Sequence, residues 1–282
     1  MKFDKNLAAL HGYLCGDGYV LKIKENFKNK HYTIGLSNQD KLLLKDFQSK
    51  YNNFFSISPH LYNERCQIAN KEIHKYLTKE YSYHSYEWII PKLSNENLRY
   101  WLRAFFDCEG WVEAEKGKNR SIKLECVNYK GINQIKDSLL RLGINSIIKT
   151  RNRTDKVIYR LNIFGLENIK KFEQKIGFLS IDKSIKLKLA INSYINYNWN
   201  IPLQKNKLLL FIKEKGRISK KRKEIRFHTI KLSNLKKLKY YLEKNNIKSN
   251  IIGPHFNQFN SKNYYLTIKS KNFDISKIYN IL

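Results

Sequence analysis

Two acidic residues lie at the ends of two apolar segments of this chain. The first segment reads LHGYLCGDG over residues 10–18, and the second reads LRAFFDCEG over 102–110. Each predicts a helix with a carboxylate at its C-terminal end, Asp17 in the first and Glu109 in the second. A helix C-terminus already carries partial negative charge, so an acid there calls for a compensating cation. A divalent metal near both acids would serve, and it would support metal-assisted hydrolysis.

The charge of the chain indicates what such a site would act on. The 282 residues contain 54 Lys and Arg against 24 Asp and Glu, a formal net charge of +30. Such an excess is tolerated best when a polyanion is the working partner, and nucleic acid is the leading candidate. An anionic membrane surface is disfavoured because the basic residues are not confined to one amphipathic helix. A Lys-rich proteome from an AT-rich genome would explain part of the excess. The two acids and the charge together favour phosphodiester chemistry.

Several other classes of protein are disfavoured by what the sequence lacks. Four cysteines without CxxC spacing and seven histidines without an HExxH cluster indicate neither a zinc site nor a redox motif. The N-terminus MKFDKNLAAL has no signal-peptide pattern, and no apolar run reaches membrane-spanning length. We therefore expect a soluble intracellular protein, in the cytoplasm or nucleoid, or in an organelle if organelle-encoded, without membrane association.

The order of predicted elements repeats along the chain. After each acid we expect two strands, a helix, two strands and a helix. In the first unit these lie at 19–24, 31–36, 38–51, 57–61, 65–68 and 71–77. In the second they lie at 111–114, 122–127, 131–142, 147–150, 157–164 and 166–176, with Gly143 as a C-cap. Both units therefore have the order helix–strand–strand–helix–strand–strand–helix.

A third, degenerate unit follows a linker near 196–204. Residues 205–218 match 102–112 in hydrophobic pattern and in the closing glycine, and strands at 225–230, 250–256 and 264–269, a helix at 234–243 and a last helix complete it. Lys215 stands where an acid stands in the other units, and Leu210 and Glu214 stand at its small-residue positions. We expect domains at 1–95, 96–196 and 205–282, the last a non-catalytic accessory nucleic-acid-binding domain that packs differently.

Small residues four apart would let the first two acid-bearing helices approach closely. Gly12 and Gly16 occupy these positions in the first helix, and Ala104 and Cys108 occupy them in the second. If these faces pack together, the two carboxylates converge one residue further on. The alternative is an ordinary buried interface with incidental acids, but that alternative gives no reason for an acid at both unfavourable helix ends.

The two segments resemble the motif helices of the LAGLIDADG homing endonuclease family. The run Trp88-Ile89-Ile90-Pro91, continuing to Leu98-Arg99-Tyr100-Trp101, also resembles the approach to the second motif in that family. The resemblance covers about residues 5–195 and implies an α+β fold. In this fold two αββαββα halves form a pseudo-two-fold saddle, here followed by a third degenerate α+β repeat. Family members with two motifs in one chain act as monomers.

The resemblance also implies roles for particular residues. The last acid of each motif binds magnesium (or manganese), helped by the carbonyl just before it, which here means Asp17 with Gly16 and Glu109 with Cys108. Lys183 resembles a basic catalytic residue that follows the sheet in some members. The sequence departs from the family at Cys15, where an aspartate is usual, although Asp107 keeps that acid in the second motif. Further departures are Ser37-Asn38 and Val127-Asn128, which stand where the family usually places Gln or Lys.

Alternating basic residues on the predicted strands indicate a DNA-reading surface. A two-stranded ribbon fits the major groove, where such side chains reach base edges. The residues expected to do so are Lys22, Lys24, Lys149, Arg151, Arg153, Arg160 and Asn162. A solvated outer face is the alternative, but the bias toward one sign of charge disfavours it.

The function expected from these features is site-specific, metal-dependent double-strand cleavage of DNA by a homing endonuclease. The alternatives are an RNA maturase that helps its intron RNA to fold, and a non-cutting DNA-binding protein on the same scaffold. An intein-embedded nuclease is a third possibility, but we expect a free-standing protein because Met1 is no splicing nucleophile and no His-Asn pair precedes Leu282.

Overall fold

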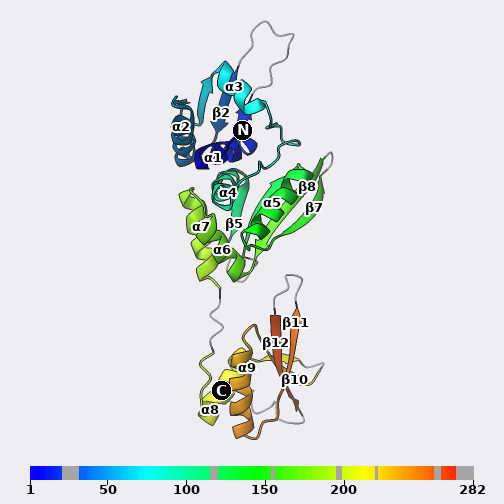
Figure 1. Cartoon of the computed structure of the whole chain (residues 1–282). Helices are drawn as coiled ribbons and strands as arrows, with labels where there is room; N and C mark the ends of the chain where they lie inside the picture. Colours follow the sequence, from blue (N-terminus) through cyan, green and yellow to red (C-terminus); the bar gives the residue numbers. More distant parts are fainter. Residues whose placement is uncertain are drawn as a thin grey trace. The chain divides into compact units, whose positions relative to one another are not determined.

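A computed structural model describes residues 1–20, 32–114, 120–153, 156–194, 199–219, 222–256 and 262–270. It divides into two compact units, Met1–Tyr194 and Ile195–Leu282. Figure 1 shows the helices and strands of each unit. Lys22, Lys24 and the predicted last helix lie outside the described residues. No helix of the described residues is long and apolar enough to cross a membrane.

The first unit contains two successive sets of elements. The first set comprises α1 (Lys5–Cys15), β1 (Gly18–Val20), β2 (Thr33–Ser37), α2 (Lys41–Phe55), β3 (His60–Leu61), β4 (Arg65–Ala69) and α3 (Lys71–Thr78). The second comprises α4 (Asn95–Glu109), β5 (Gly110–Glu113), β6 (Ser121–Cys126), α5 (Tyr129–Arg141), β7 (Ile147–Arg153), β8 (Lys156–Phe164), α6 (Leu166–Lys175) and α7 (Ile181–Asn192). The order αββαββα therefore occurs twice, and α7 is an additional helix that the repeat pattern did not predict.

The second unit has the same order without a described final helix. It comprises α8 (Lys205–Lys215), β9 (Arg217–Ser219), β10 (Glu224–Thr229), α9 (Leu232–Lys244), β11 (Asn250–Phe256) and β12 (Lys262–Lys269). All strands of the three described sheets pair antiparallel, in the orders β1-β2-β4-β3, β5-β6-β8-β7 and β9-β10-β12-β11. The predicted α+β fold with a third repeat is thus confirmed.

Register places the three helix ends at equivalent positions. Gly110 pairs with Leu124 at the start of the second sheet, and Gly18 pairs with Leu36 at the start of the first. In the third sheet Arg217 pairs with Arg226, one residue after Gly216. The residue before each of these glycines is Asp17, Glu109 or Lys215, as the sequence alignment of the units predicted. Lys215 is exposed, and Leu210 of the same helix is 43% exposed.

Capping side chains fix several helix starts. Asp4 accepts a hydrogen bond from the Leu7 amide at 2.8 Å, and Asn128 accepts one from the Gly131 amide at 2.8 Å. Asp40 caps α2, so this helix begins at Lys41 rather than at the predicted position 38. It ends at Phe55, beyond the predicted position 51, before Ser56 in the left-handed conformation.

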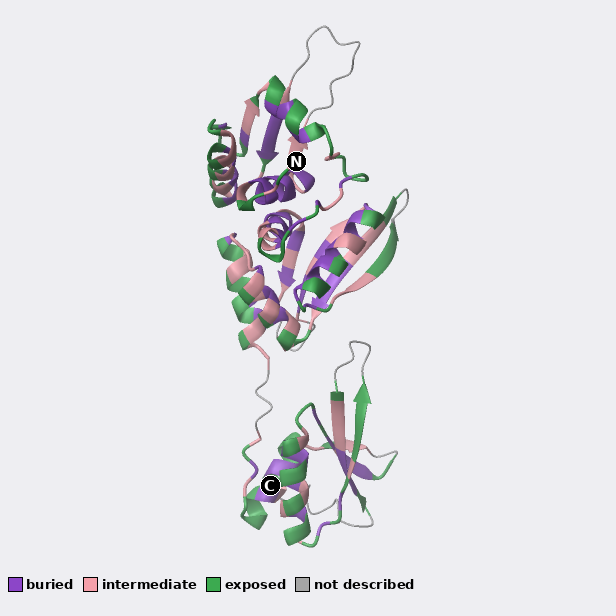
Figure 2. Cartoon of the chain, viewed as in Figure 1, coloured by how far each residue is buried: buried purple, intermediate pink, exposed green. Residues whose placement is uncertain are grey.

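The core of the first unit lies on both sides of the α1–α4 pair. One cluster packs the first sheet and α2 against α1, and the other packs the second sheet, α5 and α6 against α4. Figure 2 shows these buried faces in purple and the exposed helix faces in green. The second unit has its own core between its sheet and α8 and α9. In the first unit the two acid-bearing helices are therefore central, where packing from two sheets holds them in place.

Candidate metal centre and nucleic-acid surface

Glycines allow α1 and α4 to touch backbone to backbone. A Cβ at Gly12 would lie 2.4 Å from the Trp101 carbonyl oxygen, and a Cβ at Gly16 would lie 2.6 Å from the Cβ of Cys108. Real Cβ atoms do not approach so closely, so only glycine fits at these positions. The structure therefore pairs Gly16 with Cys108, as the spacing of small residues predicted.

This contact brings Asp17 and Glu109 into electrostatic range of each other. Burial and, to a lesser extent, the negative charge of Asp17 raise the pKa of the Glu109 carboxyl to about 7, against a lowering by Lys183. Both side chains are partly buried. Two like charges therefore share a partly desolvated place at the ends of the paired helices.

The side chain of Lys183 lies at the C-terminal end of α4, against the last carbonyl oxygens of that helix. Its ammonium donates to the Asp107 carbonyl oxygen and approaches the carbonyl oxygens of Phe106 and Cys108 at 3.5 Å. Desolvation lowers the pKa of Lys183, and nearby anions, Asp17 and Glu109 among them, raise it. A cation at a helix C-terminus offsets the partial charge of the helix. Part of the compensation that the sequence led us to expect from a metal is thus supplied by a lysine.

Asn38 is the hydrogen-bond partner of Asp17 in the first αββαββα half. Its side-chain amide donates to a carboxylate oxygen of Asp17 at 2.7 Å, and the Ser37 amide donates to the Asp17 carbonyl oxygen at 3.3 Å. The related Asn128 is instead buried and donates to the Trp88 carbonyl oxygen at 2.6 Å. The two halves therefore surround their acids differently. The signal in the sequence was an asparagine after each second strand, Asn38 and Asn128, but it did not show which asparagine would reach an acid.

Asp107 ties α7 to α4. Its carboxylate accepts hydrogen bonds from the backbone amides of Leu179, at 2.9 and 3.2 Å, and Ser180, at 3.1 Å. The pKa of Asp107 is raised to about 6, because the effect of burial exceeds the lowering by these two amides. Because Lys183 lies in the first turn of α7, this anchor also positions Lys183 against α4. Cys15, at the matching place in α1, lies 3.3 Å from His11 Nδ1.

A small cavity opens beside Glu109. It has a volume of about 270 Å³, and its lining includes Gly16, Glu109, Glu125 and Cys126. Among the described residues no group of three or more His, Cys, Asp and Glu side chains could hold a metal ion. Any metal here would therefore depend on two carboxylates, with backbone carbonyls, water or substrate oxygens completing its coordination.

The second sheet presents polar side chains on the face away from its core. Lys149 pairs in register with Arg160, on the face opposite Leu161. Lys149 and Arg151 are exposed. Arg160 forms an ion pair with Glu125 at 2.5 Å and lies 5.8 Å from the Trp111 ring centroid. The alternation of faces along these strands is as expected.

Asn162 and Arg153 differ from the exposed Lys149 and Arg151 of this face. Asn162 is only 2% exposed, because it lies on a central strand between Lys123 and Ile147, and it donates to the Arg160 carbonyl oxygen at 3.2 Å. Arg153 ends β7, and its side chain lies outside what the structure describes.

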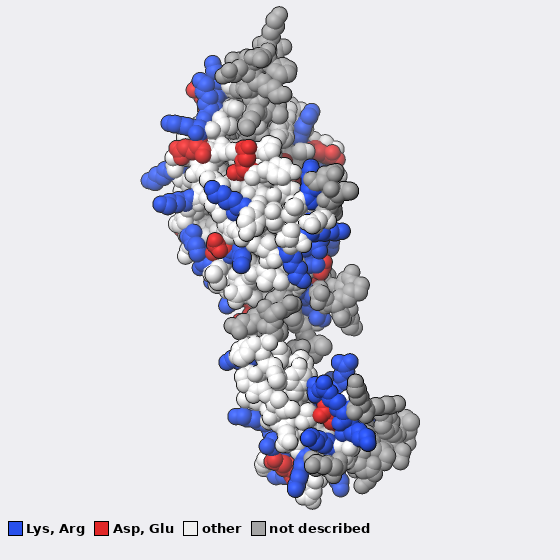
Figure 3. Space-filling view, turned by 90° about the vertical axis from the view of Figure 1, so that its right-hand side faces the viewer, with Lys and Arg blue, Asp and Glu red and all other residues white. Residues whose placement is uncertain are grey.

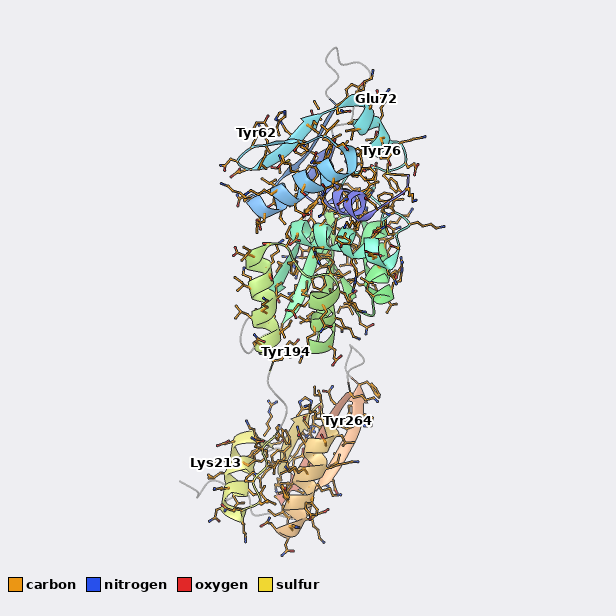
Figure 4. All side chains as sticks on the ribbon, turned by 60° about the vertical axis from the view of Figure 1, so that its left-hand side comes forward. Tyr62, Glu72, Tyr76, Tyr194, Lys213 and Tyr264 are labelled. Carbon is orange, nitrogen blue, oxygen red and sulfur yellow. The ribbon has the colours of Figure 1, made fainter. Side chains whose placement is uncertain are left out.

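An aromatic–basic pair on the first sheet was not anticipated. The Arg65 guanidinium carbon lies 5.1 Å from the ring centroid of Tyr62, which is 48% exposed beside the β3–β4 turn (Figure 4). Elsewhere, Figure 3 shows Lys and Arg scattered over the visible face, with fewer Asp and Glu. Basic side chains thus occur beyond the predicted DNA-contacting residues.

Comparison with known protein families identifies the class of protein to which this fold and its paired acids correspond. Residues 96–177 match the family described as LAGLIDADG-like domain. This second αββαββα half is therefore a LAGLIDADG-like domain, which confirms the family resemblance drawn from the two motifs.

Relatives among curated proteins carry names of unrelated functions. The chain is 30% identical over 190 residues to a replication factor C small subunit of Pyrococcus horikoshii, matching 64% of this chain and 19% of that protein. It is 26% identical over 228 residues to the same protein of Methanocaldococcus jannaschii, matching 77% and 12%. A glutamine–fructose-6-phosphate aminotransferase of Methanocaldococcus jannaschii is 25% identical over 235 residues, matching 75% and 20%. The chain thus spans about a fifth or less of these relatives.

Solved structures with similar folds include two homing endonucleases. The structure of I-DmoI in complex with DNA and Mn has a TM-score of 0.47 and 16% identity, covering 61% of this chain and 96% of that one. I-WcaI bound to its DNA recognition sequence has a TM-score of 0.48 and 18% identity, covering 66% and 88%.

Proposed function

We propose that this chain is a site-specific, metal-dependent endonuclease that cuts both strands of duplex DNA. The observation that carries the proposal is the convergence of Asp17 and Glu109 at the joined ends of α1 and α4. The acids come from different halves of the first unit, and a central contact between Gly16 and Cys108 holds them together. One acid from each half suits a reaction performed once on each of two antiparallel strands.

The residues present fit a divalent cation such as magnesium or manganese. Asp17 and Glu109 would supply carboxylate oxygens, and the carbonyls of Gly16 and Cys108 lie next to them in the chain. Magnesium in proteins is commonly held by one or two carboxylates together with water and substrate phosphate, which matches a site of two acids. When bound, such an ion would polarise the phosphate and lower the pKa of water. The raised pKa of Glu109 reflects desolvation first and the like charge of Asp17 second, and a bound cation would offset both.

The chain's own groups would position the reacting strand. Asn38 holds the Asp17 carboxylate through one oxygen and leaves the other available. Lys183 places positive charge beside both acids, where it would stabilise charge that develops on a phosphate. Lys149 and Arg151 extend from the exposed face of β7, where they suit contacts to the duplex, and Lys22, Lys24, Arg153 and Arg160 belong to the same proposed DNA-binding set. Asn162, which the sequence placed in this set, is buried and is left out of it.

The third unit suits an accessory nucleic-acid contact. Arg226 is held by Glu224 at 2.7 Å and lies 5.3 Å from the Tyr265 ring centroid, while Arg217 stands opposite it in register on β9. Together with Arg222 these arginines line a cavity of about 530 Å³. The proposed domains are thus two catalytic halves, 1–95 and 96–196, and a binding unit at 205–282.

The comparison with curated relatives suits a segment that is inserted as a module into proteins of different function. Their functions differ, yet each matches this chain over a minor part of its length. A segment that recurs beside unrelated functions suits a mobile element, whose nuclease acts at the insertion site of that element.

The proposal is tested on a duplex that joins the sequences flanking the host element. Purified full-length protein is assayed with magnesium, with manganese and with chelator. We expect double-strand cutting that Asp17→Asn and Glu109→Gln each abolish, while both variants still bind the duplex. Asp137→Asn, an exposed acid on α5, is the matched control and should cut normally. Undiminished cutting by either site variant would overturn the assignment. Binding without cutting by the wild type would instead favour a non-cutting binder, and restored intron splicing without cutting would favour a maturase.

A further inference from the structure

A second concentration of positive charge surrounds the opposite end of α4. A pocket of about 580 Å³ opens at the N-terminal end of this helix, and its lining includes Asn95, Glu96, Arg99, Arg103, Arg141 and Lys175. Four of these side chains are cationic and one is acidic. Its lining on α4 runs from Asn95 to Arg103, which places it about 9 to 21 Å from Glu109 along the helix axis, at about 1.5 Å per residue.

Backbone carbonyls hold three of the four cations in place. Arg103 donates through Nε to the Ile176 carbonyl oxygen at 2.6 Å, and Lys175 donates to that of Leu142 at 2.7 Å. Arg141 donates to the Leu93 carbonyl oxygen at 3.2 Å. The bonds from Arg103 and Lys175 satisfy carbonyls at the C-terminal ends of α6 and α5, and all three bonds fix where the cations lie.

The charge of the pocket is largely uncompensated. Across the described ranges of the chain, no ion pair joins Arg99, Arg103, Arg141 or Lys175 to a carboxylate. The first turn of α4 adds the positive end of a helix at the same place. Glu96 is exposed and lies at the rim. The Asp107 carboxylate lies in electrostatic range of Arg103 and offsets part of its charge. Among the described ion pairs, Arg99, Arg141 and Lys175 have no carboxylate partner, so these cations form a site for an anion that comes from outside the chain.

The shape of the pocket limits what that anion is. A B-form duplex is a convex cylinder far wider than a pocket of about 580 Å³, so it can touch the rim with its outer phosphates but cannot enter. A single strand can place a phosphate among the arginines. The partly buried Tyr100 also lines the pocket and offers a ring beside them. Planar guanidinium groups bind phosphate through paired N–H donors.

We propose that this pocket binds the phosphodiester backbone of a single nucleic-acid strand. The strand would be separate from the duplex that the proposed function places at the other end of α4. The inference uses the proposed function only to locate that duplex, because the pocket's own charge and shape stand without it. RNA and single-stranded DNA share the phosphodiester chemistry, and the experiment below distinguishes them.

Binding of short fluorescent oligonucleotides tests the site in the full-length protein. The probes are a single-stranded RNA, a single-stranded DNA of the same sequence and a duplex DNA, each measured over a range of salt concentrations. Arg99→Ala/Arg141→Ala should weaken binding of at least one single strand about tenfold. It should also reduce the salt slope for that strand by about 1.4, the value for two lost phosphate contacts. The strand affected more identifies RNA or DNA as the natural source.

Two matched variants keep the result specific. Lys41→Ala/Lys45→Ala removes two exposed charges from α2 and should weaken single-strand binding less than twofold. Arg99→Lys/Arg141→Lys keeps the charge but loses the planar donors, and should give an intermediate affinity. The inference would be overturned if Arg99→Ala/Arg141→Ala and Lys41→Ala/Lys45→Ala weakened single-strand binding equally. It would also be overturned if the arginine variant lost affinity only for the duplex. Because no probe is cut in this assay, the outcome does not depend on whether the chain proves to be a nuclease.

Discussion

Gly16, the C-cap of α1, faces Cys108 of α4 so closely that a Cβ at Gly16 would lie 2.6 Å from the Cβ of Cys108. This contact sits one residue before Asp17 and one residue before Glu109. The separation of the acids therefore depends directly on how closely the two helices approach. A change of a single methyl group at this contact is expected to affect both stability and the proposed chemistry.

We predict that Gly16→Ala destabilises the protein by about 1–3 kcal/mol, the usual cost of overpacking a rigid interface. Urea unfolding of the variant and the wild type measures this change. Ser49→Ala, at an exposed position of α2, is the control and should stay within about 0.5 kcal/mol. Adding Cys108→Gly to Gly16→Ala removes the opposing Cβ, so the double variant should be less destabilised than the two single changes predict. Additive effects would show that these two residues do not meet.

The acid pair itself can be tested by titration. The Glu109 carboxyl should titrate with a pKa of about 7 in metal-free protein, measured by carbon NMR of labelled glutamate. Asp17→Asn should lower this pKa, because it removes a like charge. Lys183→Met should raise it, because it removes a cation. Since a metal binds the ionised carboxylate, magnesium affinity should weaken as the pH falls below about 7. A Glu109 pKa that neither variant moves would place these groups apart.

His11 should make stability depend on pH. It is fully buried, its Nδ1 accepts from the Trp101 indole at 3.0 Å, and desolvation lowers its pKa to about 3. The unfolded state therefore binds the proton near pH 6.5, whereas the folded state does not until about pH 3. Stability should consequently be complete above pH 6.5 and decline progressively as the pH falls toward 3.

The comparison that isolates His11 is His11→Gln, which keeps an acceptor for Trp101 but cannot titrate. Urea unfolding at pH 4, 5, 6 and 7 should show a steeper acid-side decline for the wild type than for the variant. Other groups titrate equally in both proteins, so parallel curves would contradict the assignment.

Asp107 should contribute through its anchoring of α7. Asp107→Ala removes the acceptor for the Leu179 and Ser180 amides, and we expect a loss of about 1–3 kcal/mol. Asp107→Asn keeps one acceptor oxygen and should lose less. Hydrogen exchange of these two amides should accelerate in the alanine variant, whereas Asp137→Ala should leave them protected. If both amides stay protected in Asp107→Ala, the carboxylate does not hold α7.

The basic face of the third sheet should contribute affinity for duplex DNA. Arg217→Ala/Arg226→Ala should weaken duplex binding and reduce its salt slope by about 1.8, corresponding to two phosphate contacts. Lys236→Ala/Lys239→Ala on α9 removes the same charge from the helical side of this unit and serves as the control. Equal slopes for the wild type and the arginine variant would exclude a phosphate contact at this face.

The sequence by itself determined the repeated elements, the small-residue contact and the placement of one acid at each helix end. Period and local spacing fix which face of an element a residue occupies, and this information suffices for Gly16, Cys108 and the alternation around Arg160. The boundaries were less certain where a capping side chain decided them, as Asp40 did for α2. The helix α7 was not foreseen, because its exposed, lysine-rich sequence gave no clear apolar period.

Only the tertiary structure decided which polar groups reach the acids. Asn38 contacts Asp17, while the equivalent Asn128 is used to cap α5 and to bind the Trp88 carbonyl. Lys183 reaches α4 because Asp107 anchors the start of α7, more than 70 residues away in sequence. Such partners depend on how separately folded elements dock, and local periodicity carries no information about docking between distant segments.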